Sequence, residues 1–269
     1  MRTLAPRSVP LRADCVADSA GGLTFDVPAA GEAAGAHMVL RRSEGHEEVS
    51  LPLTPAGDGR LRAALPSSVA LSEGRWDAYA RVDAGEPRRL QLGATDLHSL
   101  AARTPSGSRG HVAVRIPYAN RQGRLVVRSW LRAPHAEAGE LLVRQGVLTV
   151  SGRMYGTGLG PHAHAEIHGR HASVPVRRAE VLADHAGFRF EVVYAALEPG
   201  VWDLWLRPAG EAGPAVRVAR LLDDVADKKP VFTYPRTRVD APYGPVEAGP
   251  YYTRDNDLSV SVTACASPQ

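Results

Sequence analysis

The stretch Gly74-Arg75-Trp76-Asp77-Ala78-Tyr79-Ala80-Arg81-Val82 has the residue types and the partial period-two alternation of a half-buried β-strand. Its first four residues have a close match in Gly200-Val201-Trp202-Asp203, at an offset of 126 residues. Two copies of one strand motif in a single chain indicate that the chain repeats itself.

Four further matches occur in the same order along the chain. They pair Gly22 to Phe25 with Val147 to Val150, His37 to His46 with His162 to His171, Val49 to Leu51 with Val174 to Val176, and Pro117 to Val127 with Pro250 to Val260. The offset grows from 125 to 126 to 133, so small insertions are expected in the later loops. We therefore expect a duplicated module of about 110 to 125 residues.

Each module is expected to form a β-sandwich. About seven or eight short strand patterns per module are separated by Gly, Pro, Asp and Ser, and no convincing 3.6-residue period is present. The predicted fold is all-β, with two tandem immunoglobulin-like antiparallel β-sandwiches at residues 1–132 and 133–269. The usual immunoglobulin cysteine pair is missing, so both cores are expected to lack a disulfide.

The composition fits two ordinary globular domains. The chain has 269 residues, 44% of them apolar, and a formal net charge of +3. Arginine supplies nearly all of the positive charge, since Lys228 and Lys229 are the only lysines. No dense basic run is interleaved with aromatics, so a nucleic-acid partner is not expected.

Targeting and redox signals are weak. Met1 to Asp14 has no apolar core of a signal peptide, and no stretch approaches the ~18 apolar residues of a membrane span. Cys15 and Cys265 lie near opposite ends and form neither a disulfide framework nor a zinc motif. The expectation is a soluble cytoplasmic protein with two free thiols.

The segment Pro161 to His171 is rich in histidine. On a strand, Ala163, Ala165 and Ile167 would face the core, and the alternate residues would line the other face. Those alternate residues are His162, His164, Glu166 and His168. Imidazoles two residues apart on a strand suit a metal pair, so this stripe is the candidate metal site, and a solvated strand face is the simpler interpretation.

Aromatic residues cluster late in the chain. Trp202 and Trp205 lie three residues apart on one predicted strand, so one of them is expected to leave the core unless an interface covers it. An outward Trp with nearby tyrosines suits a sugar ring or a partner protein. The candidate binding residues are Trp205, Tyr251, Tyr252 and Arg254.

Three other features have plain structural interpretations. The glycine-rich stretch Gly152 to Gly160 is followed by a strand, so a hairpin loop is expected in place of a phosphate cradle. Asp255-Asn256-Asp257 is expected to form a turn before the strand at Leu258. Asp240 to Gly249 is expected to be a long loop that packs across its own module, and Leu221 to Ala226 is a candidate for one helical turn.

The segments Leu221 to Pro230, Phe232 to Pro235 and Gly249 to Ser259 carry a resemblance. They resemble the C-terminal β-sandwich region of actinobacterial cell-wall glycosyltransferases and glycerophosphotransferases of the teichoic-acid type, best over residues 143–263. The resemblance implies an appendage for oligomerisation or polymer binding beside a separate catalytic domain. This chain departs from that pattern because it lacks the catalytic domain.

Two functions follow as hypotheses. The first is a non-catalytic binding or assembly module that forms an oligomer or docks a glycopolymer or an enzyme partner, with no catalytic residue and no cofactor. The alternative is a transferase or tailoring enzyme with a site between the modules, using the His162 to His171 face or the loop at Tyr251 and Tyr252. The sequence contains no G-x-S-x-G elbow and no local Cys-His or Ser-His-Asp grouping, so no catalytic motif favours the enzyme.

Overall fold

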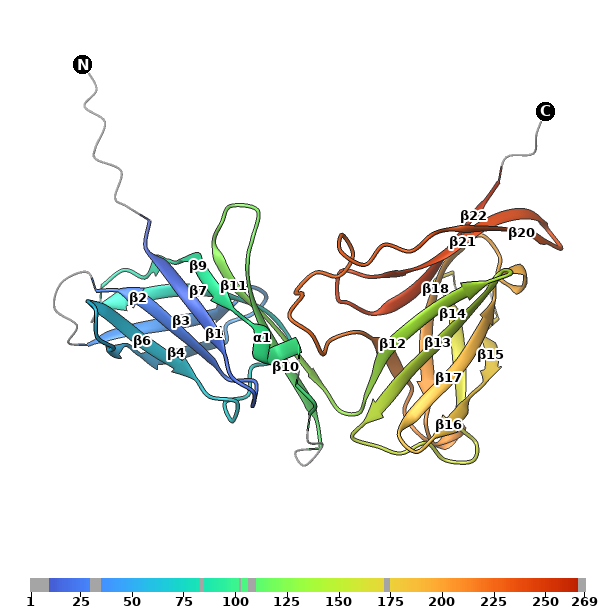
Figure 1. Ribbon diagram of the computed structural model, residues 1–269, viewed down its shortest axis with the longest axis horizontal. Coiled ribbons are helices and arrows are strands. Elements are labelled where there is room, and N and C mark those ends of the chain that lie inside the picture. Colours follow the sequence, from blue (N-terminus) through green and yellow to red (C-terminus); the bar gives the residue numbers. More distant parts are fainter. Residues whose placement is uncertain are drawn as a thin grey trace, which may run out of the picture. The chain divides into compact units, whose positions relative to one another are not determined.

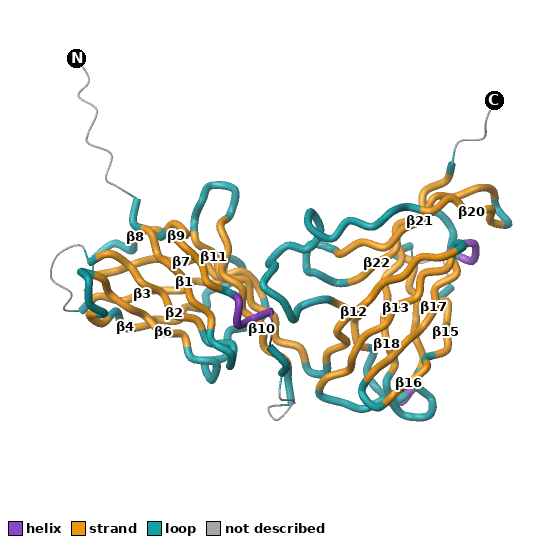
Figure 2. Tube along the Cα trace, viewed as in Figure 1, coloured by secondary structure: helices purple, strands orange, loops and turns teal. Residues whose placement is uncertain are grey.

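The protein is built almost entirely of β-strands, and this confirms the predicted all-β sandwich class (Figure 2). The computed structural model describes residues 10–29, 35–82, 85–101, 103–105, 110–171 and 175–265. Within these ranges, helical structure is limited to α1 (His98–Ala101) and two short 3-10 turns, η1 (Tyr194–Ala196) and η2 (Gly210–Ala212).

The chain divides into two compact units. Unit 1 comprises Met1–Thr104, Ala113–Leu131 and Leu222–Ala226, and unit 2 comprises Pro105–Val112, Arg132–Leu221 and Asp227–Gln269. The sequence boundary between residues 132 and 133, as the limit of two independently folding modules, stays a prediction.

Unit 1 pairs its strands in two sheets, labelled in Figure 1. The strands are β1 (Arg12–Ala17), β2 (Leu23–Pro28), β3 (Ala36–Arg42), β4 (Glu48–Pro52), β5 (Thr54–Pro55), β6 (Arg60–Leu65), β7 (Gly74–Val82), β8 (Arg88–Arg89), β9 (Gln91–Asp96), β10 (Val112–Ala119) and β11 (Leu125–Arg132). One sheet has the order β5-β6-β2-β1-β9, and the other has the order β10-β11-β7-β3-β4 with β8 beside β7.

Unit 2 differs in that one continuous hydrogen-bonded path runs through both of its layers. Its strands are β12 (His135–Arg144), β13 (Val147–Tyr155), β14 (His164–Gly169), β15 (Arg177–Glu180), β16 (Leu182–Asp184), β17 (Gly187–Val193), β18 (Gly200–Arg207), β19 (Val216–Ala219), β20 (Thr237–Ala241), β21 (Gly244–Tyr252) and β22 (Leu258–Ala264). The order is β16-β17-β13-β12-β19-β18-β22-β21-β20, with β14 between β15 and β18. The two layers are linked through β19, which pairs with both β12 and β18.

Alternation of apolar and charged residues decides which face of each strand is buried. In β17, Phe188, Phe190 and Val192 are buried, and the intervening Arg189, Glu191 and Val193 are exposed. A period of two is the spacing that puts every second side chain on the same face of a sheet. The same alternation along β18 buries Trp202, Leu204 and Leu206 in the core of unit 2.

The two repeated tryptophans have the same environment. Trp76 and Trp202 are each 1% exposed. The indole Nε1 of Trp76 donates a hydrogen bond to Ser72 O at 3.0 Å, and that of Trp202 donates one to Glu198 O at 2.8 Å. In both units the acceptor is the carbonyl four residues earlier, so the local geometry follows the sequence repeat.

Strand register extends the correspondence and corrects two parts of the alignment. Met38 lies opposite Ala80 in unit 1, and Ala165 lies opposite Leu206 in unit 2. With Ala80 matched to Leu206, His37 corresponds to His164 and not to His162. Val49 lies opposite Leu40 as Arg177 lies opposite Ile167, so Val49 corresponds to Arg177 and not to Val174. The shared pairing supports a duplication, which stays an inference, as does the immunoglobulin-like label.

Several local predictions are confirmed. The turn at Asp255-Asn256-Asp257 is closed by a hydrogen bond from Thr253 N to Asp257 O at 2.8 Å, with Asn256 in the left-handed region at φ 63°. Cys15 and Cys265 are both free thiols. Burial raises the pKa of the Cys15 thiol to about 12, with Asp14 and Asp26 adding to the rise.

Three other local predictions need correction. Asp240 to Gly249 is not a loop, because most of it belongs to the β20–β21 hairpin; it does pack on its own unit, through the Tyr243 hydroxyl, which donates to Leu197 O. Residues 221–226 form bends and no helical turn. The first residues of the glycine-rich stretch, Gly152 to Tyr155, belong to β13, so the β13–β14 loop begins at Gly156.

No helix in the described ranges has the length and apolar character needed to cross a bilayer.

The two tryptophan bonds lead to a first prediction. Trp202→Phe removes a buried donor and leaves a small void, which we expect to cost unit 2 about 2 kcal/mol. Trp76→Phe is the matched change in unit 1. Hydrogen–deuterium exchange on peptides from each unit measures both: each variant should accelerate exchange mainly in its own unit, and equal acceleration in both units by either variant would refute independent folding of the modules.

Candidate functional site

The face of the β14–β18–β22–β21 layer that points away from the core carries a group of interacting polar and aromatic side chains. We call it the outer face and define it by His168 of β14, Asp203 and Trp205 of β18, Ser259 of β22 and Tyr251 of β21. The register places these residues opposite one another: His168 faces Asp203, and both Asp203 and Tyr251 lie opposite Ser259.

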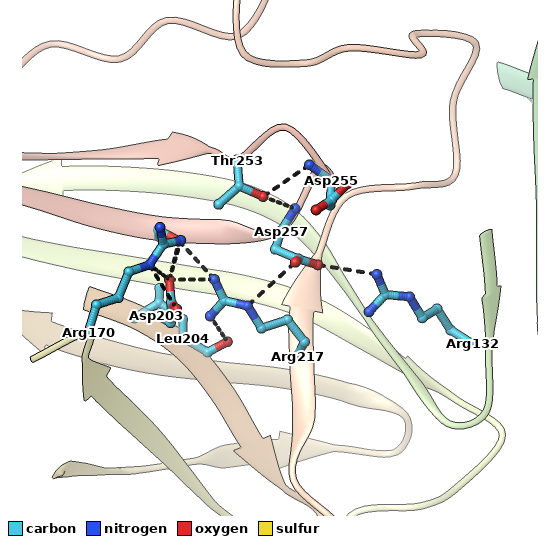
Figure 3. Close-up of polar contacts among 9 residues, drawn as sticks. Arg132, Arg170, Asp203, Leu204, Arg217, Thr253, Asp255 and Asp257 are labelled. Atoms are coloured by element: carbon cyan, nitrogen blue, oxygen red, sulfur yellow. Dashed lines mark hydrogen bonds and ion pairs between the residues drawn. The ribbon is translucent and has the colours of Figure 1, made fainter. Parts of the chain in front are cut away.

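Asp203 is the centre of the hydrogen bonding on this face (Figure 3). Arg170 donates to both of its carboxylate oxygens, from Nε at 3.2 and 3.1 Å and from Nη2 at 3.0 Å. Arg217 Nη2 donates to Oδ1 at 2.7 Å, and the Ser259 hydroxyl donates at 2.8 Å. Burial alone would raise the pKa of Asp203, but these donors and the two guanidinium charges lower it below its ordinary value.

Arg217 is the most buried cation of this network, with 7% of its side chain exposed. It donates from Nη1 to Leu204 O at 3.1 Å and from Nη2 to Ser259 Oγ at 2.8 Å, and its Nε lies 3.7 Å from Asp257 Oδ2. Burial lowers the pKa of Arg217 more than Asp203 and Asp257 raise it. An arginine stays charged even so, and the two carboxylates compensate for its lost hydration.

Trp205 lies over this buried charge. The guanidinium carbon of Arg217 is 5.3 Å from its ring centroid, and the imidazole of His168 is 5.9 Å away at a 45° tilt. Trp202, three residues earlier, is buried in the core, so the prediction that one of these two tryptophans leaves the core is confirmed. A cation against an indole face gains electrostatic energy and is protected from water.

Unit 1 has the same arrangement with different side chains. Asp77 accepts a hydrogen bond from Arg89, and the Arg89 guanidinium lies 4.8 Å from the Tyr79 ring. Arg41 lies 5.2 Å from the same ring, in the place that His168 takes in unit 2. The Asp–Arg–aromatic group is therefore a shared structural feature, and it accounts for Trp205 without a ligand.

The histidine stripe has the predicted orientation. Ala165 and Ile167 are buried in the core, and His164, Glu166 and His168 lie on the opposite face. His162 lies in the turn before β14, and its carbonyl contacts His164 Nδ1 at 3.1 Å. In the described residues no group of three His, Cys, Asp or Glu is placed to hold a metal ion, so the metal-site prediction gains no support.

Glu166 is held as a structural anion. His168 Nε2 lies 2.9 Å from Oε2, Arg207 Nε donates to the same oxygen at 3.1 Å, and His164 Nε2 is 3.5 Å from Oε1. Burial would raise the pKa of Glu166, but the bonds with His168 and Arg207 outweigh it and lower the pKa. A carboxylate in this state is a poor proton donor at neutral pH.

The four predicted binding residues separate into two groups. Trp205 and Tyr251 are half-buried on the outer face, and Arg254 is exposed in the turn after β21. Tyr252 is fully buried, and burial raises its pKa strongly. Its ring packs against Phe232 at 6.0 Å and Tyr234 at 6.3 Å, so Tyr252 supports the site from the core and presents no surface to a ligand.

A groove of about 440 Å³ lies beside Tyr251. We call it the aromatic groove; one side is residues 229–236, the covering segment, and the other is the paired strands β21 and β22. Its main lining side chains are Lys229, Phe232, Tyr234, Arg236, Tyr251 and Ser261. Gly249 makes the close approach of the covering segment possible, because a Cβ there would lie 3.3 Å from Pro235 O.

Cations frame the aromatic groove. Lys229 Nζ lies 5.7 Å from the Tyr251 ring centroid, and the Arg220 guanidinium lies 4.4 Å from the Phe232 ring. Arg236 is fixed by Glu247, whose backbone carbonyl accepts at 2.6 Å and whose carboxylate accepts at 3.2 Å. The groove thus combines flat apolar surfaces with hydrogen-bond donors, the pattern of a small-molecule or polymer subsite.

Sequence reasoning identified Tyr251 and the late aromatic cluster but gave no role to Lys229, Phe232 or Arg236. The alternation of Phe232, Tyr234 and Arg236 was the available signal. It does not show which strand the segment crosses.

No family model and no curated protein matches the chain. Solved structures with similarity include S. aureus TarS, at TM-score 0.40 and 16% identity over 58% of this chain and 28% of that chain. A TarS fragment, residues 217–571, gives 0.32 and 9% over 68% and 55%. Pullulanase type I from Bacillus subtilis str. 168, complexed with maltose, gives 0.26 and 11% over 78% and 25%. The chain spans about a quarter to a half of these proteins, and TM-scores below 0.5 carry no functional argument.

The network around Asp203 leads to a second prediction. Asp203→Asn should lower the free energy of unfolding by about 2 kcal/mol at pH 7, because Arg217 loses its nearest buried counter-charge. The pKa of Asp203 is lowered by folding. Its stabilising effect is therefore complete above the ordinary aspartate pKa and is lost as the pH falls through the lowered value.

Urea unfolding at pH 7 and pH 3 tests this. The difference between wild type and Asp203→Asn should shrink at pH 3. Glu211→Gln, which breaks the exposed ion pair with Arg178, is the control and should change stability by only a few tenths of a kcal/mol. An Asp203→Asn effect that is equally large at both pH values would contradict the electrostatic explanation.

Proposed function

We propose that the chain is a non-catalytic binding module that docks a glycopolymer in the aromatic groove of unit 2. The observation that carries the proposal is the set of rings around one groove: Phe232, Tyr234 and Tyr251 line it together. Aromatic side chains present flat apolar faces suited to sugar rings, and their edges tolerate the hydroxyl groups around them.

The exposed lysine supports an acidic polymer over a neutral one. Lys229 is exposed beside Tyr251, whereas Arg236, which lines the same groove, is already paired with the Glu247 carboxylate. An ammonium group is a mobile point charge that pairs with carboxylate or phosphate without a fixed geometry. Ser261 adds a hydroxyl that both donates and accepts.

The wider setting belongs to the same proposal. The resemblance of Leu221 to Pro230 and Gly249 to Ser259 to teichoic-acid-type transferases suggests a role linked to cell-envelope glycopolymers. A protein partner or a homo-oligomer, and a cytoplasmic location, are further parts of the proposal that the sequence alone motivates.

A transferase or tailoring enzyme is the alternative. Its one favourable observation is the contact of His168 with Glu166 at 2.9 Å. The same carboxylate oxygen also accepts from Arg207, and the pKa of Glu166 is lowered. A residue held this way fits an ion pair better than a general acid, so binding is the preferred function.

The decisive experiment is affinity electrophoresis of the full chain in gels that contain either poly(glycerol phosphate) with sugar substituents on its glycerol units or a neutral glucan. Wild type should be retarded by the acidic polymer. Tyr251→Ala should weaken retardation about tenfold, since removing a central ring costs ~1–2 kcal/mol. Tyr118→Ala, which changes the corresponding residue of unit 1, is the matched control and should migrate like wild type.

Lys229→Ala separates the contribution of charge. It should weaken binding to the phosphate polymer and reduce the salt dependence, with little effect on any binding to the glucan. Equal retardation of wild type, Tyr251→Ala and Lys229→Ala in every gel would refute the proposed site.

A further inference from the structure

A second groove, of about 420 Å³, opens at the side of unit 2 between β15 and β17. We call it the lateral groove. Its inner side chains are Ile167, Ala179, Phe190, Val192 and Leu197, all from the core or packed against it. It shares no lining residue with the aromatic groove, so a ligand in one groove does not depend on a ligand in the other.

The lateral groove exists because the chain passes from one layer of the sandwich to the other at Val181. β15 pairs with β14 in one layer, and β16 pairs with β17 in the other. The β16–β17 pairing covers only Gly187 to Arg189, so in the described chain no strand is hydrogen-bonded to Phe190–Val193 on that side. The lateral groove therefore lies between the two strand edges, over core side chains that are at most 3% exposed.

Arg177 is the one charged lining residue whose strand position is on the core-facing side, and its side chain is exposed at the edge of the groove. It stands directly opposite Ile167, which is 3% exposed and belongs to the core. Strand alternation places Arg178 and Glu180 on the outer side of β15, and Arg189 and Glu191 on the outer side of β17. Among the described residues, no carboxylate forms an ion pair with Arg177, whereas Arg178 pairs with Glu211 at 2.6 Å.

The corresponding strand edge of unit 1 carries apolar side chains. Val49 lies opposite Leu40 there, as Arg177 lies opposite Ile167 in unit 2, and Leu51 lies opposite Met38, as Ala179 lies opposite Ala165. Leu51 is 5% exposed and fills the edge of unit 1. In unit 2 a charge replaces an apolar side chain, and an alanine pair replaces Leu and Met.

Exposed apolar residues gather at the same place. Leu182 is 63% exposed and Val193 is 50% exposed, and both line the lateral groove. Val176, at 46%, directly precedes β15. By the same alternation, Leu182, which lies opposite Arg189, and Val193 are on the outer side of the β16–β17 pair, so they form an apolar rim of the groove and not its core-facing wall.

We propose that the lateral groove binds an amphiphile with an apolar chain and a single carboxylate. The apolar chain would enter the groove over Phe190, Val192 and Leu197, which are at most 2% exposed in the free protein, and the carboxylate would pair with the exposed Arg177. The volume suits a ligand of that size, and one cation at the edge of an apolar lining fixes its orientation. An extended peptide beside β17 fits less well, because the exposed charges of Arg189 and Glu191 guard that edge.

The probe is decanoate, titrated below its micelle concentration into isotope-labelled full chain and followed by NMR. Saturable shifts are expected at Phe190 to Leu197. Arg177→Val and Ala179→Leu introduce the residues that unit 1 has at the corresponding positions, Val49 and Leu51. Arg177→Val should weaken binding about tenfold by losing a charge-assisted bond, and Ala179→Leu should abolish it by filling the groove. Arg144→Val, which removes an exposed arginine of β12, is the control and should leave binding unchanged.

Decanol separates charge from packing. Wild type should prefer decanoate over decanol about tenfold, and Arg177→Val should bind both equally. Equal weakening of both ligands by Arg177→Val would overturn the role of Arg177, and unchanged binding by Ala179→Leu would overturn the site. A Val-Thr repeat peptide that slows amide exchange at Phe190–Val193, with no decanoate binding, would identify a peptide as the occupant and overturn the amphiphile.

Discussion

The outer face of unit 2 depends on the neutralisation of one buried guanidinium. Arg217 is almost fully enclosed, and an isolated charge there would be costly. Asp203 compensates for that cost and also accepts hydrogen bonds from Arg170 and Ser259, which join the end of β14 and the start of β22 to β18. Trp205 then covers the pair. Polar atoms on this face are mostly committed to one another, so the surface left for recognition lies at its margin, beside Tyr251.

The two units show how one framework can hold different sites. Their tryptophan bonds, Asp–Arg–aromatic groups and strand registers correspond, while the side chains around them differ. Arg41 in unit 1 becomes His168 in unit 2, and Val49 becomes Arg177. Both grooves lie in unit 2, at places where its chain has an added segment or smaller edge residues. Structural requirements thus constrain the strands, and variation concentrates at edges and connections.

Features governed by nearby residues followed from the sequence. Alternation predicted the opposite faces of Trp202 and Trp205, and the Asp-Asn-Asp turn was recognisable from its residue types. The ion pair of Asp203 with Arg217 could not be predicted from the sequence, because it depends on the register between β18 and β19. The aromatic groove was missed for a similar reason: nothing local in residues 229–236 reveals that they cross Gly249. The hairpin of β20 and β21 is not predictable from the sequence, because its prolines and glycines are typical of a loop although Thr237 pairs with Ala248.

The position of Trp205 also has an optical consequence. The protein has four tryptophans, and Trp76, Trp130 and Trp202 are at most 1% exposed. These three indoles are buried and have no contact with solvent beyond that small fraction. Trp205 alone lies on the outer face, where its ring contacts both the Arg217 guanidinium and the His168 imidazole. Its emission is therefore a built-in reporter of rearrangements at the outer face, readable without any added label.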